Sequence, residues 1–115
     1  FLRARDGLAL LTAIGQIEYG RIVGSGAGQL LFPLSFDWNE DTNVFVLDAG
    51  NARVQVFDGD GGYVTQWGGR GTGEGLFDFG EGNAPEDYFG SIALDAEGYI
   101  YVAEPLNHRI QIFAP

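Results

Sequence analysis

Hydrophobic and polar residues alternate along two segments of the chain that are almost the same. Residues 44–57 read VFVLDAGNARVQVF, and residues 100–113 read IYVAEPLNHRIQIF. Each copy has an alternating apolar run, an acid, a short turn with Asn, and an Arg that opens a second alternating run. A period of two is typical of β-strands, and two such runs joined by a short turn predict an antiparallel pair. The chain therefore contains an internal repeat.

The alternation extends beyond these segments and predicts an all-β chain. Gly-containing turns, such as those at 58–62 and 97–98, separate the apolar runs as hairpins require. No stretch has a convincing helical period, so we expect almost no helix. The predicted strands are residues 16–23, 34–38, 44–48, 53–58, 63–68, 91–95, 99–104 and 109–113.

The second copy of the repeat contains an insertion. Asn51 and Asn107 are 56 residues apart (107 − 51). A Gly-rich segment at 24–33 (GSGAGQLLFP) is paralleled by residues 68–77 (GGRGTGEGLF), which gives a spacing of only 44 (68 − 24). We therefore place roughly a dozen extra residues after the second Gly-rich segment, which leaves a period of about 44, close to that of four-stranded propeller blades.

These features resemble the NHL family of β-propeller repeats. Blades of that family carry a Gly-rich linker, an Asp-Gly hairpin, a Tyr-Val-Ala-Asp-like strand and an Asn-His-Arg-Ile-Gln-x-Phe segment. Residues 107–113 (NHRIQIF) match the last signature, and the similarity extends over residues 20–113. The resemblance implies all-β propeller blades of four antiparallel strands, but it says little about function because one fold serves many functions.

The resemblance also implies an incomplete propeller. Residues 24–68 would form one blade, residues 69–115 a second blade without its outer strand, and residues 1–23 N-terminal strands that include the outer strand of a neighbouring blade. Two explanations stay open: other copies of the chain complete the propeller, or the sequence is an excerpt of a longer one. In the first case, residues 16–23 of one chain complete the second blade of the next, giving a homo-oligomeric ring or a filament.

Residues 1–14 do not follow the repeat. Their apolar run at 8–14 is too short to span a membrane. We expect a strand that pairs with residues 16–23, and the alternative is the remnant of a signal peptide.

The net charge of the chain limits the classes of partner that it is expected to bind. Six Arg, no Lys and 16 acids give a formal net charge of −10. Binding to a nucleic acid backbone needs clustered cations, so this chain would repel phosphates and we expect no nucleic acid partner. Arg without Lys, in a Gly- and Ala-rich chain, favours a bacterial source, and the excess of acids is compatible with an extracellular or cell-surface location.

Two polar sets recur at the same places in both copies and favour a structural role. Asn suits a turn position with positive φ, and Arg can reach the acid that ends the preceding strand and so fix the hairpin. The alternative is a ring of ligand-binding groups at one face of a propeller. The two sets are Asp48, Asn51 and Arg53, and Glu104, Asn107 and Arg109.

Metal or cofactor chemistry has little support in the sequence. His108 is the only histidine and there is no Cys, so the ligands of a zinc site are missing and we expect His108 to be structural or exposed. The peptidyl-hydroxyglycine lyases, which are similar to the NHL fold, depend on histidine-bound zinc, and that activity is not expected here. Asp58 and Asp60 are weak candidates for calcium, but Asp-Gly tips are ordinary hairpin chemistry.

The inserted loop at 80–89 is the most distinctive departure from the repeat. Inserted loops tend to carry function. With Phe79 beside it, the loop could offer an acidic rim around aromatic anchors for the basic patch of another protein or for a second subunit. The alternative is a solvated loop that folds over a blade edge. The candidate partner-binding residues are Glu81, Glu86, Asp87, Tyr88 and Phe89.

No nucleophilic triad, carboxylate pair or nucleotide fingerprint is visible in the sequence. We therefore expect a non-catalytic propeller scaffold that binds protein, most simply other copies of itself, and that needs no cofactor. The alternative is a fragment of a secreted propeller lyase or hydrolase whose catalytic residues lie in other blades.

Overall fold

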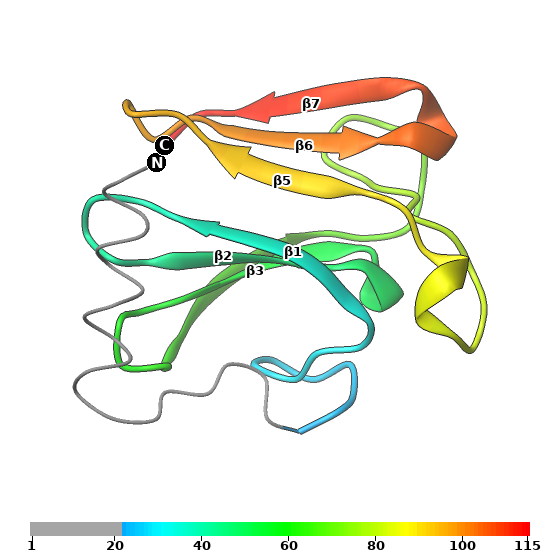
Figure 1. Ribbon diagram of the computed structural model, residues 1–115, viewed down its shortest axis with the longest axis horizontal. Helices are drawn as coiled ribbons and strands as arrows, with labels where there is room; N and C mark the ends of the chain where they lie inside the picture. Colours follow the sequence, from blue (N-terminus) through cyan, green and yellow to red (C-terminus); the bar gives the residue numbers. More distant parts are fainter. Residues whose placement is uncertain (1–21) are drawn as a thin grey trace.

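The computed structural model describes residues 22–115, which form two antiparallel sheets and no α-helix (Figure 1). Three short 3-10 turns interrupt the strands: η1 (Ala49–Asn51), η2 (Pro85–Asp87) and η3 (Pro105–Asn107). The prediction of an all-β chain is confirmed for this part. The first sheet contains β1 (Pro33–Trp38), β2 (Val44–Asp48), β3 (Arg53–Phe57) and β4 (Tyr63–Gly68), in that order. The second contains β5 (Ser91–Leu94), β6 (Ile100–Glu104) and β7 (Arg109–Phe113).

The two sheets are built on the same register. Val46 pairs with Gln55 across β2 and β3, and Val102 pairs with Gln111 across β6 and β7. Adding 56 to each residue of the first pair gives the second pair. In the described part of the chain, β4 has no counterpart beside β7, so β7 is an edge strand.

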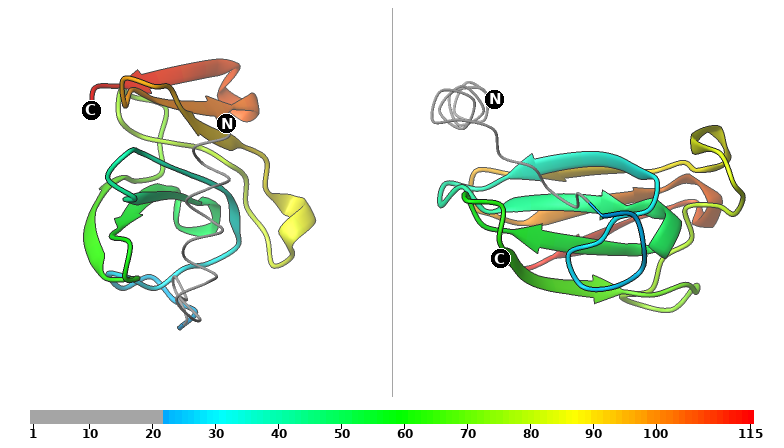
Figure 2. Two further views of the ribbon diagram at one scale, coloured as in Figure 1. Left: turned by 60° about the vertical axis from the view of Figure 1, so that its left-hand side comes forward. Right: turned by 90° about the horizontal axis from the view of Figure 1, so that it is seen from below.

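The sheets pack face to face, with β1 alongside β5 (Figure 2). The Ser35 hydroxyl and the backbone of Ile92 are hydrogen-bonded across this contact, and the Asp37 carboxylate accepts a bond of 2.8 Å from the Leu94 N–H. These hydrogen bonds link β1 and β5, the first strands of the two sheets, which do not pair with each other as a ladder. They fix the position of the second sheet on the first.

The core lies between the sheets and arises from the alternation in the sequence. Leu47 and Val54 of the first sheet meet Ile100 and Val102 of the second, and all four are buried. The ring of Phe77 lies against Phe79 and Phe113, with ring centroids 5.2 and 5.9 Å apart. Since apolar burial is the main stabilising contribution, this layer holds the two sheets together.

The structure corrects the predicted register of the Gly-rich linkers. Gly24 N–H donates to Leu30 O, and Gly71 N–H donates to Phe77 O, at 3.1 and 2.9 Å. Gly24 therefore corresponds to Gly71 and not to Gly68, which is a spacing of 47 (71 − 24). The insertion is then nine residues long (56 − 47), shorter than predicted from the sequence, and the repeat without it is 47 residues long.

The positive φ angles also differ from the prediction, because Asn51 and Asn107 are not the residues that adopt them. In these two turns the left-handed residues are Ala52 (φ 52°) and His108 (φ 54°), each directly after a 3-10 turn. A left-handed residue is a common way to end a helical turn. The Asn side chains serve instead as hydrogen-bond donors, as described below.

The predicted strand at 16–23 falls almost wholly outside the described residues, and the predicted strand in residues 1–14 lies outside them altogether. Of the former, Val23 forms an isolated parallel bridge with Leu30. Within residues 22–115, there is no helix with the length and apolar character needed to cross a membrane.

Replacing Phe77 with alanine should lower the free energy of unfolding by about 3–5 kcal/mol, because the substitution leaves a cavity in the core. Urea denaturation followed by circular dichroism measures this change. The matched control is Phe89→Ala, since the Phe89 side chain is 52% exposed. Equal losses of stability in the two variants would contradict the placement of Phe77 in the core.

Candidate functional site

A buried carboxylate organises the polar set of the first sheet. Asp48 is fully buried at the end of β2. It accepts hydrogen bonds from Arg53 Nε at 2.7 Å, from Asn51 Nδ2 at 2.9 Å and from Leu31 N–H at 2.7 Å. Gln55 adds a further bond through its side-chain amide, at 3.2 Å. A buried charge needs this number of partners because it has no water to solvate it.

The second sheet repeats this cluster around Glu104, which is also fully buried. Arg109 Nε and Gln111 Nε2 each donate to Glu104 at 2.8 Å, and Asn107 Nδ2 donates at 2.9 Å. The N–H of Asp78 donates at 3.2 Å, in the place that Leu31 has in the first copy. Glu104 therefore accepts hydrogen bonds from the same kinds of donor as Asp48, although its side chain is longer.

Each Arg also holds the Gly-rich linker. Arg53 donates from its terminal nitrogens to the carbonyl oxygens of Ser25, Gly26 and Gln29 and to the side chain of Gln66. With the bond to Asp48, all five N–H groups of the guanidinium have protein acceptors. In the second copy the acceptors are the carbonyl oxygens of Thr72, Gly73 and Leu76.

This saturation argues against a ligand-binding role for Arg53, because a guanidinium with no spare N–H cannot bind a ligand without first releasing the linker. Arg109 differs in that, within the described chain, its Nη1 donates only to Thr72 O. The ion pairs that the sequence predicts, Arg53 with Asp48 and Arg109 with Glu104, are present. Gln55 and Gln111 were missed as members of the clusters, although their recurrence at the same place in both copies was a signal that could have identified them.

The cluster controls the ionisation of Glu104. Burial alone would raise the pKa of this carboxyl, but the hydrogen bonds from Arg109, Gln111, Asn107 and the Asp78 backbone outweigh it. The net result is a pKa below the ordinary value of 4.5. Glu104 is therefore charged in the folded protein at neutral pH.

The fold should lose stability in acid as Glu104 takes up a proton. A carboxyl with a depressed pKa stabilises the fold fully above its unfolded pKa, here near 4.5, and this stabilisation is lost as the pH falls through the lower folded pKa. Glu104→Gln should therefore be less stable than the wild type near neutral pH, and its stability should change less on acidification. Urea midpoints across the acid range measure this, with Glu86→Gln as an exposed control. Parallel curves for wild type and Glu104→Gln would contradict the role of the charge.

The inserted loop is held by its own side chains. The Asp87 carboxylate accepts bonds of 3.1 Å from the N–H groups of Asn83 and Ala84. Gly80 forms a bridge with Tyr88, and any side chain at Gly80 would collide with the Asp87 carbonyl oxygen. The loop is therefore a defined structure that folds against the sheets.

Two aromatic residues of the predicted partner surface are buried, so that expectation is corrected. Tyr88 is 7% exposed, stacks on Phe32 and donates its hydroxyl to Gly82 O at 2.7 Å. Phe79 is fully buried in the core. These two rings attach the loop to the protein and are not available to a partner.

The outward-facing part of the loop is smaller than predicted. Phe89 remains exposed, as does Glu86, and Glu81 lies 3.7 Å from Arg70 with most of its side chain in water. A single exposed ring flanked by carboxylates remains as the candidate contact surface.

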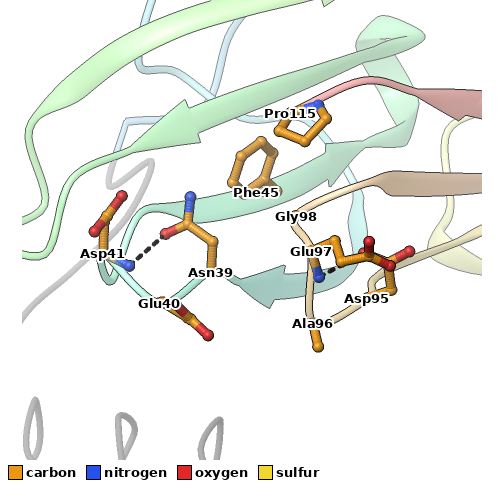
Figure 3. Close-up of a pocket in the computed structure, with 9 residues that line it drawn as sticks. All are labelled: Asn39, Glu40, Asp41, Phe45, Asp95, Ala96, Glu97, Gly98 and Pro115. Carbon is orange, nitrogen blue, oxygen red and sulfur yellow. Dashed lines mark hydrogen bonds between the residues drawn. The ribbon is translucent and has the colours of Figure 1, made fainter.

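The end of the protein that carries the β1–β2 and β5–β6 turns is acidic. A pocket of about 190 Å³ lies between the β1–β2 and β5–β6 turns (Figure 3). Phe45 and Pro115 line it together with Glu40, Asp41 and Glu97. In residues 22–115, no group of three or more His, Cys, Asp or Glu side chains is placed to hold a metal ion.

The weak calcium candidates lie at this same end, in the β3–β4 turn. Asp58 Oδ1 accepts bonds from the N–H groups of Asp60 and Gly62, at 2.9 and 2.8 Å. This is an Asx turn, in which the carboxylate replaces a backbone acceptor. Asp95 makes the equivalent bonds to Glu97 and Tyr99, so these acids shape hairpins.

Two apolar surfaces without a described partner adjoin β7. The first is a groove of about 490 Å³ between the two sheets, lined by residues that include Val56, Trp67 and Phe113. Trp67 Nε1 is buried and has no hydrogen-bond acceptor within the described chain.

The second surface is the outer face of β5–β7, which points away from the first sheet. We define it by the residues that alternate with the core positions of these strands. Among them, Tyr101, Ile110 and Ile112 are 37, 64 and 58% exposed. The set is Ser91, Ala93, Tyr101, Ala103, Ile110 and Ile112.

A comparison with models of protein families gave no match, and a search of the curated proteins gave none either. The likeness to NHL repeats therefore rests on the residues quoted above.

Proposed function

We propose that this chain is a non-catalytic, propeller-type scaffold that associates head to tail with other copies of itself. In this arrangement each sheet acts as a blade and stacks on the next. The second sheet of one copy receives the first sheet of another. The proposal rests on one observation, the equivalence between an exposed apolar face and a buried one.

The outer face of β5–β7 corresponds, position by position, to the face that the first sheet buries against the second. Leu47 pairs with Val54 on that buried face, and the offset of 56 places Ala103 and Ile110 at the same positions. Val54 is fully buried, whereas Ile110 is 64% exposed. The second sheet therefore repeats the docking surface of the first, with apolar side chains retained at exposed positions.

The other side of the first sheet is exposed only in part: Val46, directly opposite Phe36, is 5% exposed, and Val44 and Phe57 are buried in the same cluster. Phe36 corresponds to Ile92 by the same offset, and Ile92 is 5% exposed because it packs between the sheets. Phe36 is 54% exposed. A second copy that placed Phe36 against Ser91 of the outer face would repeat the contact that Ile92 makes with Ser35 inside the chain. Such an interface joins two different surfaces, so it gives a closed ring or a filament.

The substitution Ile110→Asp should abolish association, because it places a charge where an apolar side chain would be buried. Multi-angle light scattering on the purified chain measures the mass as a function of concentration. Leu106→Asp is the matched control, since Leu106 is 45% exposed but lies in η3, away from the outer face.

Phe36→Asp should have the same effect as Ile110→Asp, and mixing the two variants should give dimers at most, because each retains one intact surface. A wild-type chain that remains a folded monomer at high concentration would overturn the proposed function.

A further inference from the structure

Within the described residues, the second sheet lacks a sheet on its outer face, and it also lacks a strand beside β7. In the first sheet, β3 pairs with β2 on one side and with β4 on the other. Within the described residues, β7 pairs only with β6. Its free edge exposes backbone groups that can pair with another strand.

The groove between the sheets lies where a strand beside β7 would run. Its lining includes Val64, Thr65 and Trp67 of β4, and Phe113 of β7 with Pro115 after it. A fourth strand on the second sheet would cover the part of the first sheet that extends beyond β7. The groove therefore continues the sheet–sheet core, and its apolar lining suits the inward side of such a strand. Trp67 Nε1 adds a buried donor that needs an acceptor.

We propose that this site, the β7 edge with its adjoining groove, binds residues 16–21 of a second copy as an antiparallel strand. The inference rests on the proposed function, since it specifies how one copy meets the next. The linker offset of 47 maps β4 (Tyr63–Gly68) onto residues 16–21. In each case the segment directly precedes a Gly-rich linker, so residues 16–21 are the piece of chain that the repeat assigns to this position.

The sequence of this segment, QIEYGR, fits the groove side of the site. The pairing of β3 with β4, transferred by the two offsets, places Glu18 opposite Ile112 and Gly20 opposite Ile110. Ile17 and Tyr19 then face the groove, because they alternate with Glu18 and Gly20. Ile17 is apolar like the groove, and the Tyr19 hydroxyl oxygen can accept the hydrogen bond from Trp67 Nε1.

Disulfide trapping tests this register, and the chain is suited to it because it contains no cysteine. Two single-cysteine variants, Ile112→Cys and Glu18→Cys, are mixed, oxidised and analysed by mass spectrometry. Residues directly opposite in an antiparallel pair have Cα atoms about 4.5–5.5 Å apart, within the range that a disulfide spans. We expect a covalent heterodimer from this mixture.

The register control mixes Ile112→Cys with Ile17→Cys, whose side chain would point to the opposite face of the strand. This mixture should give at least about tenfold less heterodimer, because a shift of one residue reverses the side chain. Circular dichroism of each variant establishes that it is folded before oxidation. As a measurement without cysteine, Tyr19→Asp should weaken self-association about tenfold or more, because it places a charge in the apolar groove.

The outcomes separate this site from the proposed function. Association by light scattering without the Glu18–Ile112 disulfide, and without an effect of Tyr19→Asp, would overturn the strand site and leave the stacking of sheets standing. A chain that does not associate at all would overturn both. A disulfide formed within one monomeric chain of the double variant Glu18→Cys/Ile112→Cys would overturn the assignment to a second copy.

Discussion

The fold depends on a buried carboxylate that joins three segments of chain in each repeat. Asp48 and Glu104 lie at the end of the second strand of their sheets, β2 and β6. Each pairs with the Arg that opens the next strand, and this Arg in turn holds the Gly-rich linker. Removing one partner of such a buried pair costs about 3–5 kcal/mol, because the other charge is left without compensation. The linker is rich in glycine and has little apolar surface of its own, so these polar bonds determine its path. That path in turn places Phe77 in the core.

The two sheets differ in how well their faces are buried, and the polar clusters do not remove this difference. The polar clusters fix the geometry of a single repeat, but they do not bury the faces of its sheet, which need a neighbour on each side. Repeat proteins generally divide their stability between the unit and the interface in this way. One interface is made inside this chain, and Val54 is fully buried there. The equivalent Ile110 has no sheet packed on it within the described residues and is exposed.

The strands were predictable because alternation is a local property. Every strand in the described part lies within one residue of its predicted bounds, and β2, β4 and β7 have the predicted ranges 44–48, 63–68 and 109–113. The linker register was not predictable, since glycine-rich sequences align equally well at several offsets and only the hydrogen bonds of Gly24 and Gly71 distinguish them. The burial of Tyr88 was hidden for a different reason. Its stacking partner Phe32 is distant in sequence and reaches it only when the sheets pack.

The nine-residue insertion gives the two repeats different identities. It is present in the second repeat and missing from the first, and its Tyr88 side chain holds it against the protein while Phe89 is exposed. In any assembly built head to tail from this chain, the loop would recur once for every two sheets, at a fixed spacing and on the same rim. A weak ligand of a single loop becomes a strong one when several such loops are held at matching distances. The insertion would thus turn a stack of nearly identical sheets into a multivalent display.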